Sequence, residues 1–581
     1  MEIGDRRREG RVGHGGRDTR GGLSTRSGRG RAVVGAVLAA GALVVAGCST
    51  SAGAPEAASP AASNVRTDGT TPGWSPPACD RPAAAPPVAV PVDGVASDHT
   101  VTSFDGTELR VHWFPLATGE PPAPTVLMGP GWGLPGDTNE DAVGVLGALN
   151  IKALRDAGFN VLTWDPRGFG RSTGTAEVDS KDFEGRDVQV LLDWVAAQPG
   201  VQVDRAGDPR VGMIGGSYGG GIQLVTAAID CRVDAIVPVI AWHSLETSLD
   251  KSETPKTGWS NILIAVSKTA SVDQHAIDAS ADANATGVID PAEVQWFRDR
   301  GPGDLVGTIR VPTLIVQGTV DTLFTLDEGI ANYRILRDNG VPVSMMWFCG
   351  GHGTCLTDAG DTDRVSTASI AWLKRWVQRD TTAPEGRRVD VIDQHGASYQ
   401  ADDYPLPAGA PITATGTGTL ALASGGGAGP LTDLPPDKPD LLRSLVVPVT
   451  PARATNAVDV TIATPAAALV VGAPELTVRY SGTADPGERP TRVFAQLVDD
   501  ETGRVLGNQI TPVAVALDGQ PHELTVPLES VAFATAVGGS ITLQLVATTV
   551  AYAQPRLGGS VTFDRIEVRL PTAASITPTA G

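Results

Sequence analysis

Short apolar strands alternate with helical segments between residues 100 and 377, and this alternation limits the possible folds more than any other feature. The expected strands are 100–104, 108–114, 125–128, 159–164, 210–214, 235–239, 313–317 and 343–348, and the clearest helices are 183–198 and 365–377. Such short strands separated by helices form a parallel sheet with helices on both faces. Ligands of these sheets bind in the loops that follow the strands.

One of these loops contains a candidate nucleophile, Ser217, in the sequence Gly-Gly-Ser-Tyr-Gly-Gly. In the Gly-x-Ser-x-Gly elbow, glycines let a strand and a helix approach closely while the serine hydroxyl projects above the sheet. The pattern alone is weak in a chain with 69 glycines, where a glycine-rich turn with a capping serine is the alternative. Its position between the strand 210–214 and an apolar helix favours the elbow.

A nucleophilic serine needs a general base, and the base needs an acid that orients it. Asp321 and His352 each follow a predicted strand, so both are expected at the same sheet edge as Ser217, in the order that α/β-hydrolases use. We therefore predict the catalytic residues Ser217, Asp321 and His352. Asp327 is the fallback acid and His243 the closest rival base, and the alternative is a capping aspartate and a packed loop histidine.

Acyl transfer also needs donors for the oxyanion of the tetrahedral intermediate. One donor is expected to be the backbone N–H of Tyr218, directly after the serine. The other is expected in the loop after the strand 125–128, where we predict the backbone N–H of Trp132. The alternative is that this loop, Gly-Pro-Gly-Trp-Gly, is only a turn.

Four stretches carry a family resemblance, namely 165–172 (DPRGFGRS), 184–199 (EGRDVQVLLDWVAAQP), 210–220 (RVGMIGGSYGG) and 318–324 (GTVDTLF). They resemble the bacterial X-prolyl dipeptidyl aminopeptidase and cocaine-esterase family of α/β-hydrolases, over roughly residues 96–575. The resemblance implies the same three catalytic residues. It also implies that the segment 241–305 caps the active site. Several relatives use a tyrosine side chain as an oxyanion donor, but this chain has Trp132 and no tyrosine in that loop.

The C-terminal third no longer alternates strand and helix. Its expected strands are 445–449, 457–462, 476–480, 492–497, 522–526 and 541–546. Their spacing and the turns between them predict a β-sandwich, which the resemblance implies is a jelly roll. We thus expect an α/β-hydrolase fold with a helical cap over 97–385 and a jelly-roll sandwich over 386–575.

The first 96 residues are expected to serve export and tethering. The 15 small and apolar residues 32–46 are too few for a bilayer span of about 20 residues, but suit a signal peptide. They end in Val-Ala-Gly-Cys48, which resembles a bacterial lipobox and predicts lipidation of Cys48 after removal of 1–47; a plain secretory signal is the alternative. The segment 48–96 is rich in Ala, Pro, Ser and Thr, as in a flexible tether. These features predict a lipid-anchored or secreted protein outside the bacterial membrane.

The net charge and one local motif bear on which partners and metals the chain is expected to bind. The net charge of -20 argues against nucleic acid, which needs basic surfaces. The segment 282–293 partly matches a calcium-binding EF-hand loop, but Asp290 also suits an ordinary helix cap, so we predict no metal and no cofactor. The membrane is expected to be contacted only through the lipid anchor.

The cysteines offer two pairings. Cys349 and Cys355 flank His352, and a disulfide between them would restrict the loop of the histidine. Cys79 and Cys231 would form the other pair, and free buried thiols are the alternative.

These observations predict a serine hydrolase that cleaves an acyl bond in a peptide or small-molecule substrate. The expected substrate is an X-Pro peptide or a carboxylic ester. A non-catalytic cell-surface binding protein on a hydrolase scaffold is the alternative.

Overall fold

The computed structural model describes residues 79, 94–117, 121–141, 150–432 and 447–574. The predicted signal peptide, Cys48 and most of the predicted tether lie outside these residues. Among the helices that are described, none combines the length and the apolar character needed to span a bilayer.

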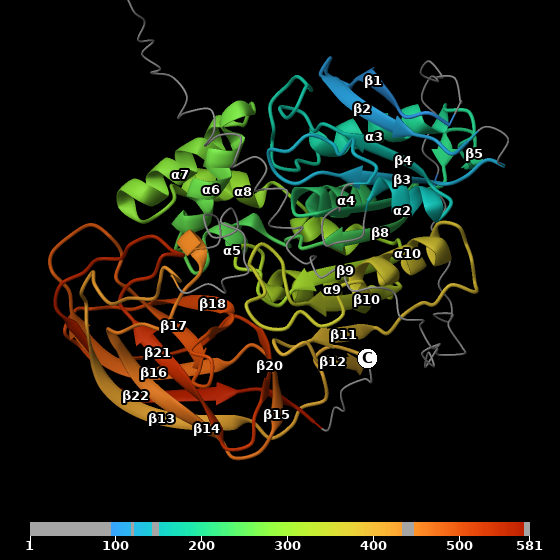
Figure 1. Ribbon diagram of the computed structural model, residues 1–581. Helices are drawn as coiled ribbons and strands as arrows, with labels where there is room; N and C mark the ends of the chain where they lie inside the picture. Colours follow the sequence, from blue (N-terminus) through green and yellow to red (C-terminus); the bar gives the residue numbers. More distant parts are fainter. Residues whose placement is uncertain (1–78, 80–93, 118–120, 142–149, 433–446, 575–581) are drawn as a thin grey trace, which may run out of the picture.

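The first domain is built on a ten-stranded sheet with the order β1-β2-β4-β3-β7-β8-β9-β10-β11-β12 (Figure 1). Its strands are β1 (Ser97–Thr102), β2 (Glu108–Phe114), β3 (Thr125–Gly129), β4 (Asn160–Trp164), β7 (Val211–Gly216), β8 (Val233–Val239), β9 (Thr313–Gly318), β10 (Val343–Phe348), β11 (Val389–Ile392) and β12 (Ser398–Ala401). The strands from β4 to β11 run parallel, and antiparallel strands complete both ends.

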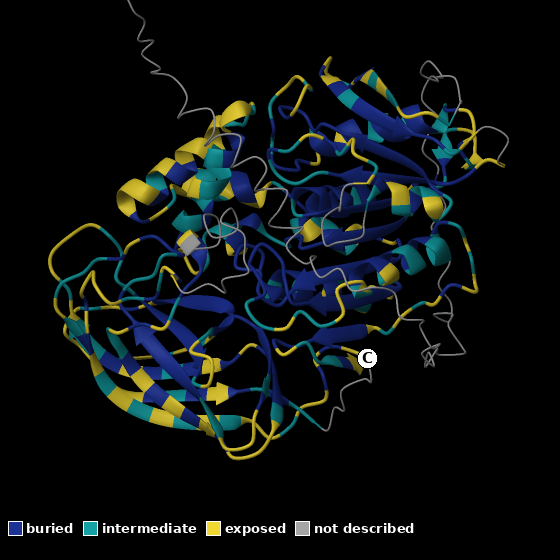
Figure 2. Cartoon of the chain, in the orientation of Figure 1, coloured by how far each residue is buried: buried dark blue, intermediate teal, exposed yellow. Residues whose placement is uncertain are grey.

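Helices cover both faces of this sheet, as the alternating sequence predicts. They are α2 (Ile151–Asp156), α3 (Glu184–Ala196), α4 (Tyr218–Ile229), α9 (Leu326–Asp338) and α10 (Arg364–Trp376). Every residue of β3, β7, β9 and β10 is buried, which explains why these strands are mostly apolar and do not alternate between polar and apolar residues (Figure 2). A small hairpin, β5 (Val203–Arg205) and β6 (Asp208–Pro209), lies apart from the sheet.

The segment between β8 and β9 forms a helical cap. It contains α5 (Leu245–Leu249), α6 (Thr257–Val266), η1 (Ser267–Thr269), α7 (Gln274–Thr286), α8 (Pro291–Arg298) and η2 (Gly303–Thr308). Figure 1 shows α6, α7 and α8 grouped beside the sheet and next to the second domain. The EF-hand-like segment has no calcium-loop conformation, because Asp282 lies within α7 and the Asp290 carboxylate caps α8 by accepting from the Ala292 N–H at 2.8 Å.

The second domain is a sandwich of antiparallel sheets. One sheet has the order β13-β22-β16-β19, the facing sheet β14-β21-β17-β18, and a third β20-β15-β23. The strands are β13 (Ile412–Ala421), β14 (Ala457–Thr464), β15 (Ala468–Gly472), β16 (Glu475–Thr483), β17 (Arg492–Asp499), β18 (Val505–Ala514), β19 (His522–Pro527), β20 (Val531–Thr535), β21 (Gly539–Val546), β22 (Ser560–Leu570) and β23 (Thr572–Ala573). Together with the parallel sheet, this confirms the predicted fold class.

Two details differ from the prediction. The α/β sheet extends beyond the expected boundary at residue 385, because β11 and β12 continue it to residue 401. The described part of the expected strand 445–449 is instead the 3-10 turn η3 (Val447–Val449). Pro448 explains the second difference, since proline has no N–H for a sheet ladder.

Candidate active site

Ser217 lies on a sharp turn between β7 and α4. Its backbone adopts φ 57° and ψ -119°, an unusual conformation for a residue with a side chain. The two glycines of the motif are required by close packing. A Cβ on Gly215 would lie 2.6 Å from the carbonyl oxygen of Gly129 on β3, and a Cβ on Gly219 only 2.2 Å from it. The turn therefore has the geometry of a nucleophile elbow.

Asp321 and His352 meet Ser217 at this edge of the sheet. The Ser217 Oγ lies 2.8 Å from His352 Nε2, and His352 Nδ1 lies 2.8 Å from Asp321 Oδ2. Asp321 is fully buried. The other oxygen, Asp321 Oδ1, accepts from the backbone N–H groups of Leu323 and Phe324, at 3.0 and 2.8 Å. The structure thus brings the three predicted residues into one chain of hydrogen bonds.

The His352 ring is fixed from several sides. Phe324 and Trp259 meet it edge to face, with centroids 5.0 and 5.7 Å away. A disulfide between Cys349 and Cys355 closes the loop around it. Its own backbone N–H donates to Asp321 Oδ2 at 3.1 Å. These contacts hold the imidazole in place beside Ser217.

The β-sandwich also holds both loops. Gln509 Nε2 on β18 donates to the backbone carbonyl of Asp321 at 2.6 Å. Asn508 Nδ2 donates to the carbonyl of Thr354, two residues after His352, at 3.1 Å. Sequence analysis missed these two residues, because nothing in the strand pattern indicates which residues of the second domain face the first.

The alternative acid and base lie elsewhere. The Asp327 carboxylate accepts from the Ser530 hydroxyl and lies 3.8 Å from the Lys251 ammonium, at the contact with the β-sandwich. His243 Nδ1 lies 2.9 Å from Asn332 Oδ1 on α9. Neither is placed against Ser217.

Tyr218 and Trp132, the two predicted oxyanion residues, have their rings in edge-on contact, with centroids 5.3 Å apart. Tyr218 begins α4, where the first backbone N–H groups have no acceptor within the helix. The indole N–H of Trp132 donates to the carbonyl of Leu263 in the cap at 3.2 Å. The Trp132 side chain therefore does not replace the tyrosine hydroxyl of the relatives, and the role of its backbone N–H stays a prediction.

A buried carboxyl anchors the Tyr218 side chain from behind. The Tyr218 hydroxyl donates to Glu184 Oε1 on α3 at 3.3 Å and accepts from the backbone N–H of Asp179 at 3.3 Å. Burial raises the pKa of Glu184 to about 7. This anchor fixes the start of α4, directly after Ser217.

An apolar pocket opens beside Ser217 under the cap. Trp132, Tyr218 and Phe324 surround its catalytic end. The other lining residues come from helices α5, α6, α7 and α8 and from loops that include Val178, Trp242 and Leu323. The space amounts to about 770 Å³, including the part open to solvent. Its concave and mostly apolar wall is typical of a small-molecule binding site.

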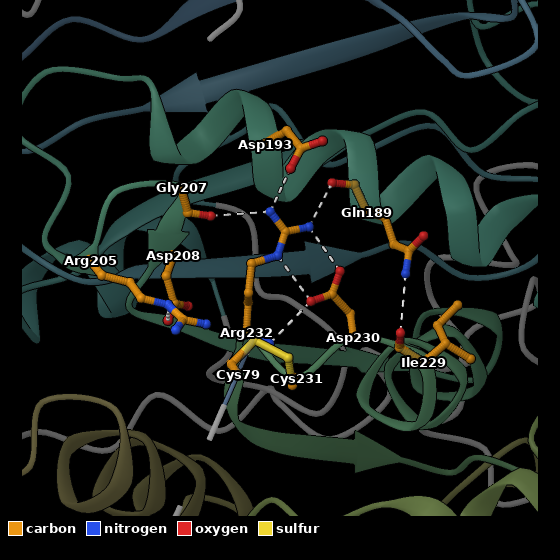
Figure 3. The surroundings of a disulfide bond; sticks show 10 residues. All are labelled: Cys79, Gln189, Asp193, Arg205, Gly207, Asp208, Ile229, Asp230, Cys231 and Arg232. Carbon is orange, nitrogen blue, oxygen red and sulfur yellow. Dashed lines mark hydrogen bonds and ion pairs between the residues drawn. A yellow bond between two sulfur atoms is a disulfide. The ribbon is translucent and has the colours of Figure 1, made fainter. Parts of the chain in front are cut away.

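The second disulfide, Cys79–Cys231, lies at the far end of α4 (Figure 3). The next residue, Arg232, is held by several hydrogen bonds beside this disulfide. Its guanidinium donates to Asp230 at 2.8 and 2.9 Å and to the carbonyl of Gln189 at 3.1 Å. Ser217 precedes α4 and Cys231 follows it, so about 18 Å of helix separates them at 1.5 Å per residue. Cys79 is thus fixed on the side of the domain away from the nucleophile.

Comparison with known proteins supports a hydrolase with this fold. Residues 105–354 match the family model described as X-Pro dipeptidyl-peptidase (S15 family). The fold is similar to a crystal structure of a CocE/NonD family hydrolase from Staphylococcus aureus, with a TM-score of 0.60 and 12% identity over 82% of this chain and 93% of that chain. It is also similar to an α-amino acid ester hydrolase, with a TM-score of 0.55 and 13% identity over 85% and 98% of the two chains.

An aminopeptidase from a marine sediment archaeon, Thaumarchaeota archaeon, has a TM-score of 0.57 and 15% identity over 86% of this chain and 99% of that chain. Among curated proteins, a polyketide transferase of a Penicillium species is 28% identical over 145 residues, which are 25% of this chain and 44% of that protein. The chain spans less than half the length of the curated relatives that it matches. Residues 105–354 are thus similar to the X-Pro dipeptidyl-peptidase family S15, and this match together with the shared α/β-hydrolase fold supports a hydrolase enzyme.

Proposed function

We propose that the protein is a serine hydrolase that cleaves an acyl bond with Ser217 as nucleophile, His352 as general base and acid, and Asp321 as the group that orients His352. The observation that carries this proposal is the continuous chain of hydrogen bonds from Ser217 to His352 to Asp321, with 2.8 Å at each link. Such a chain has the arrangement that nucleophilic serine catalysis needs.

In the first half-reaction Ser217 Oγ attacks the acyl carbonyl carbon while its proton passes to His352 Nε2. The C=O electron pair becomes the oxyanion, which the Tyr218 backbone N–H and the predicted Trp132 backbone N–H would stabilise. When the intermediate collapses, the bond to the leaving alcohol or amine breaks and His352 returns its proton to that group. An acyl ester of Ser217 remains.

In the second half-reaction water attacks the acyl carbon and gives a proton to His352. The bond to Ser217 Oγ then breaks, and the same proton restores the serine hydroxyl. Asp321 accepts from His352 Nδ1–H throughout, which holds Nε2 toward the serine and stabilises the imidazolium. Neither half-reaction needs a metal ion or another cofactor, so we propose that none is used.

Two substrate classes fit this chemistry. The family match supports X-Pro peptides, and the fold similarity to ester hydrolases supports carboxylic esters. Both release an acyl group through the same intermediate. Turnover of Ala-Pro-p-nitroanilide and of p-nitrophenyl acetate by wild type and by Ser217→Ala tests the proposal. We expect release of p-nitrophenol or p-nitroaniline by wild type and a loss of at least about 10³-fold in Ser217→Ala.

Equal turnover by wild type and Ser217→Ala on both substrates would contradict the proposed nucleophile. Absence of turnover by wild type on both substrates would instead favour the alternative function, a non-catalytic cell-surface binding protein on a hydrolase scaffold.

We also propose that the protein acts outside the cell, attached to the membrane through lipid on Cys48. The disulfides Cys79–Cys231 and Cys349–Cys355 support export, because disulfides form and persist mainly in oxidising compartments outside the cytosol. Globomycin, which blocks lipoprotein signal cleavage, should cause accumulation of the longer precursor, and unchanged processing would argue against the anchor.

A further inference from the structure

The pocket beside Ser217 has no acidic side chain among the described residues that line it. Its wall is built from aliphatic, aromatic and small side chains, together with Ser217, Ser260, Ser280 and, among the described lining residues, a single basic residue, Lys256. An N-terminal ammonium group in such a pocket would meet no counter-charge. This observation distinguishes between the two substrate classes of the proposed function.

Lys256 cannot supply the missing negative charge. Its side chain is 3% exposed, and its ammonium donates to the backbone carbonyls of Thr322 and Leu323 at 3.1 and 2.9 Å. Burial lowers the pKa of Lys256. Whether neutral or protonated, a lysine does not pair with a substrate ammonium. Its contacts instead fix the loop that follows Asp321.

Four buried carboxylates of neighbouring segments are not among the residues that line the pocket. Asp321 accepts from His352 and from two backbone N–H groups. Glu529 pairs with Lys251 at 3.1 Å at the contact between the domains. Asp179 and Glu184 lie on the other side of Tyr218, in a separate small cavity.

The depth of the pocket comes from one face of α7. Ala276, Ala279, Ser280 and Ala283 line it, at the spacing of three and four residues that places side chains on one side of a helix. Because these side chains are small, they leave space under the cap that Leu263 and Phe297 bound with apolar surface. The space suits a chain of methylene groups or a phenyl ring.

We propose that this pocket holds the acyl group of the substrate and that the acyl group is uncharged and apolar. The preferred substrates are esters of unsubstituted medium-chain or aryl-alkanoic acids, and substrates with a free amine on the acyl part are rejected. The inference rests on the proposed function, since it assumes acylation of Ser217. Its physical basis is that burying an unpaired ammonium costs far more than burying a methyl group.

The test compares p-nitrophenyl hexanoate with p-nitrophenyl 6-aminohexanoate at pH 7. The two esters share the leaving group and differ only in a terminal ammonium, which is charged at this pH. We expect kcat/KM for the amino ester to be at least about a hundredfold lower, because the pocket gives the ammonium no partner. Equal rates, or a preference for the amino ester, would overturn the proposal.

A matched pair of variants on α7 tests whether the acyl group binds in this pocket. Ala279 is buried in the pocket wall and Ala281 is exposed on the opposite face. Ala279→Phe should lower the ratio of kcat/KM for the hexanoate to kcat/KM for the acetate at least about tenfold, because only the longer chain reaches the filled space. Ala281→Phe should change neither ester. Equal losses on acetate and hexanoate in Ala279→Phe would overturn the assignment of this pocket to the acyl chain.

A second pair adds the missing charge. Ser280→Asp places a carboxylate in the wall, and Ser280→Asn is the neutral control of the same shape. Relative to the control, the aspartate should raise the ratio of amino-ester to hexanoate turnover at least about tenfold. An unchanged ratio in a folded Ser280→Asp variant would contradict the placement. Failure of wild type to hydrolyse the acetate and the hexanoate alike would instead count against the proposed hydrolase function itself.

Discussion

The side-chain amide of Gln509 donates a 2.6 Å hydrogen bond to the backbone carbonyl of Asp321. The two residues belong to different domains and are 188 positions apart in the sequence. Asn508 makes the equivalent contact to the loop of His352 through Thr354. The β-sandwich therefore holds the acid and the base against the nucleophile, which is a structural reason for its presence.

Replacing Gln509 should reduce the rate more than the affinity. We predict that Gln509→Ala lowers kcat about tenfold and changes KM less than about threefold, since misplacement of a catalytic loop raises the barrier without removing substrate contacts. Gln520→Ala, at an exposed position of the same domain, is the control and should behave as wild type. A Gln509→Ala variant with unchanged kcat and a lowered melting temperature would show that the contact only stabilises the fold.

The choice of Asp321 rather than Asp327 as the acid that orients His352 can be tested by mutation. Asp321→Asn should lower kcat by about 10⁴, because an amide at this position no longer holds His352 in the correct tautomer. Asp327→Asn should retain kcat within about threefold, because its carboxylate contacts Ser530 and Lys251 rather than His352. Steady-state kinetics on one ester is sufficient. The assignment would be wrong if the larger loss followed Asp327→Asn.

The two disulfides should have separable effects. Replacing Cys349 and Cys355 by serine opens a bridge with a sequence separation of 6 residues around His352, so kcat should fall at least about threefold. Replacing Cys79 and Cys231 opens a bridge with a separation of 152 residues, which should cost more stability, about 5 against about 2 kcal/mol from loop entropy. It should leave kcat unchanged, because this bridge lies at the far end of α4. Melting temperatures and kcat of both double variants check the prediction, and a reversed order would contradict it.

The stability of the domain contact should depend on pH. Burial and the neighbouring Glu529 raise the pKa of Asp327 well above its usual value of 3.8. A carboxyl with a raised pKa in the folded state stabilises most fully below the unfolded pKa and loses this contribution as pH rises through the folded value. We therefore predict that the melting temperature falls between pH 5 and pH 8.

Asp327→Asn should flatten this dependence, because the amide does not titrate. Asp338→Asn, at a side chain that is 66% exposed, is the matched control and should keep the wild-type slope. Thermal unfolding at several pH values is the measurement. Identical slopes in all three proteins would rule out Asp327 as a source of the pH dependence.

Much of the fold follows from local sequence patterns. Strands such as β9 and β10 are buried on both faces, so they appear as continuous apolar runs followed by glycine-rich loops. The elbow and the order of Asp321 and His352 are equally local. The predicted family resemblance agrees with the match of residues 105–354 to the family model.

Other features depend on packing that sequence does not reveal. The strand β13, ITATGTGTLA, was not predicted, because its exposed face carries threonines and its inner positions include glycines that pack against Val458 and Val460 of β14. The contacts of Gln509 and Asn508 require knowledge of how two domains meet. The missing carboxylate in the pocket is likewise a property of side chains from distant segments, which only the folded chain brings together.

The central claim, that Ser217 is a nucleophile activated by His352, is tested most directly by labelling the purified protein with a fluorophosphonate and locating the adduct by mass spectrometry. The account predicts one adduct per molecule, on the peptide containing Ser217, absent in Ser217→Ala and at least about a hundredfold slower to form in His352→Ala. Labelling at another residue, or labelling of Ser217→Ala at the wild-type rate, would contradict it.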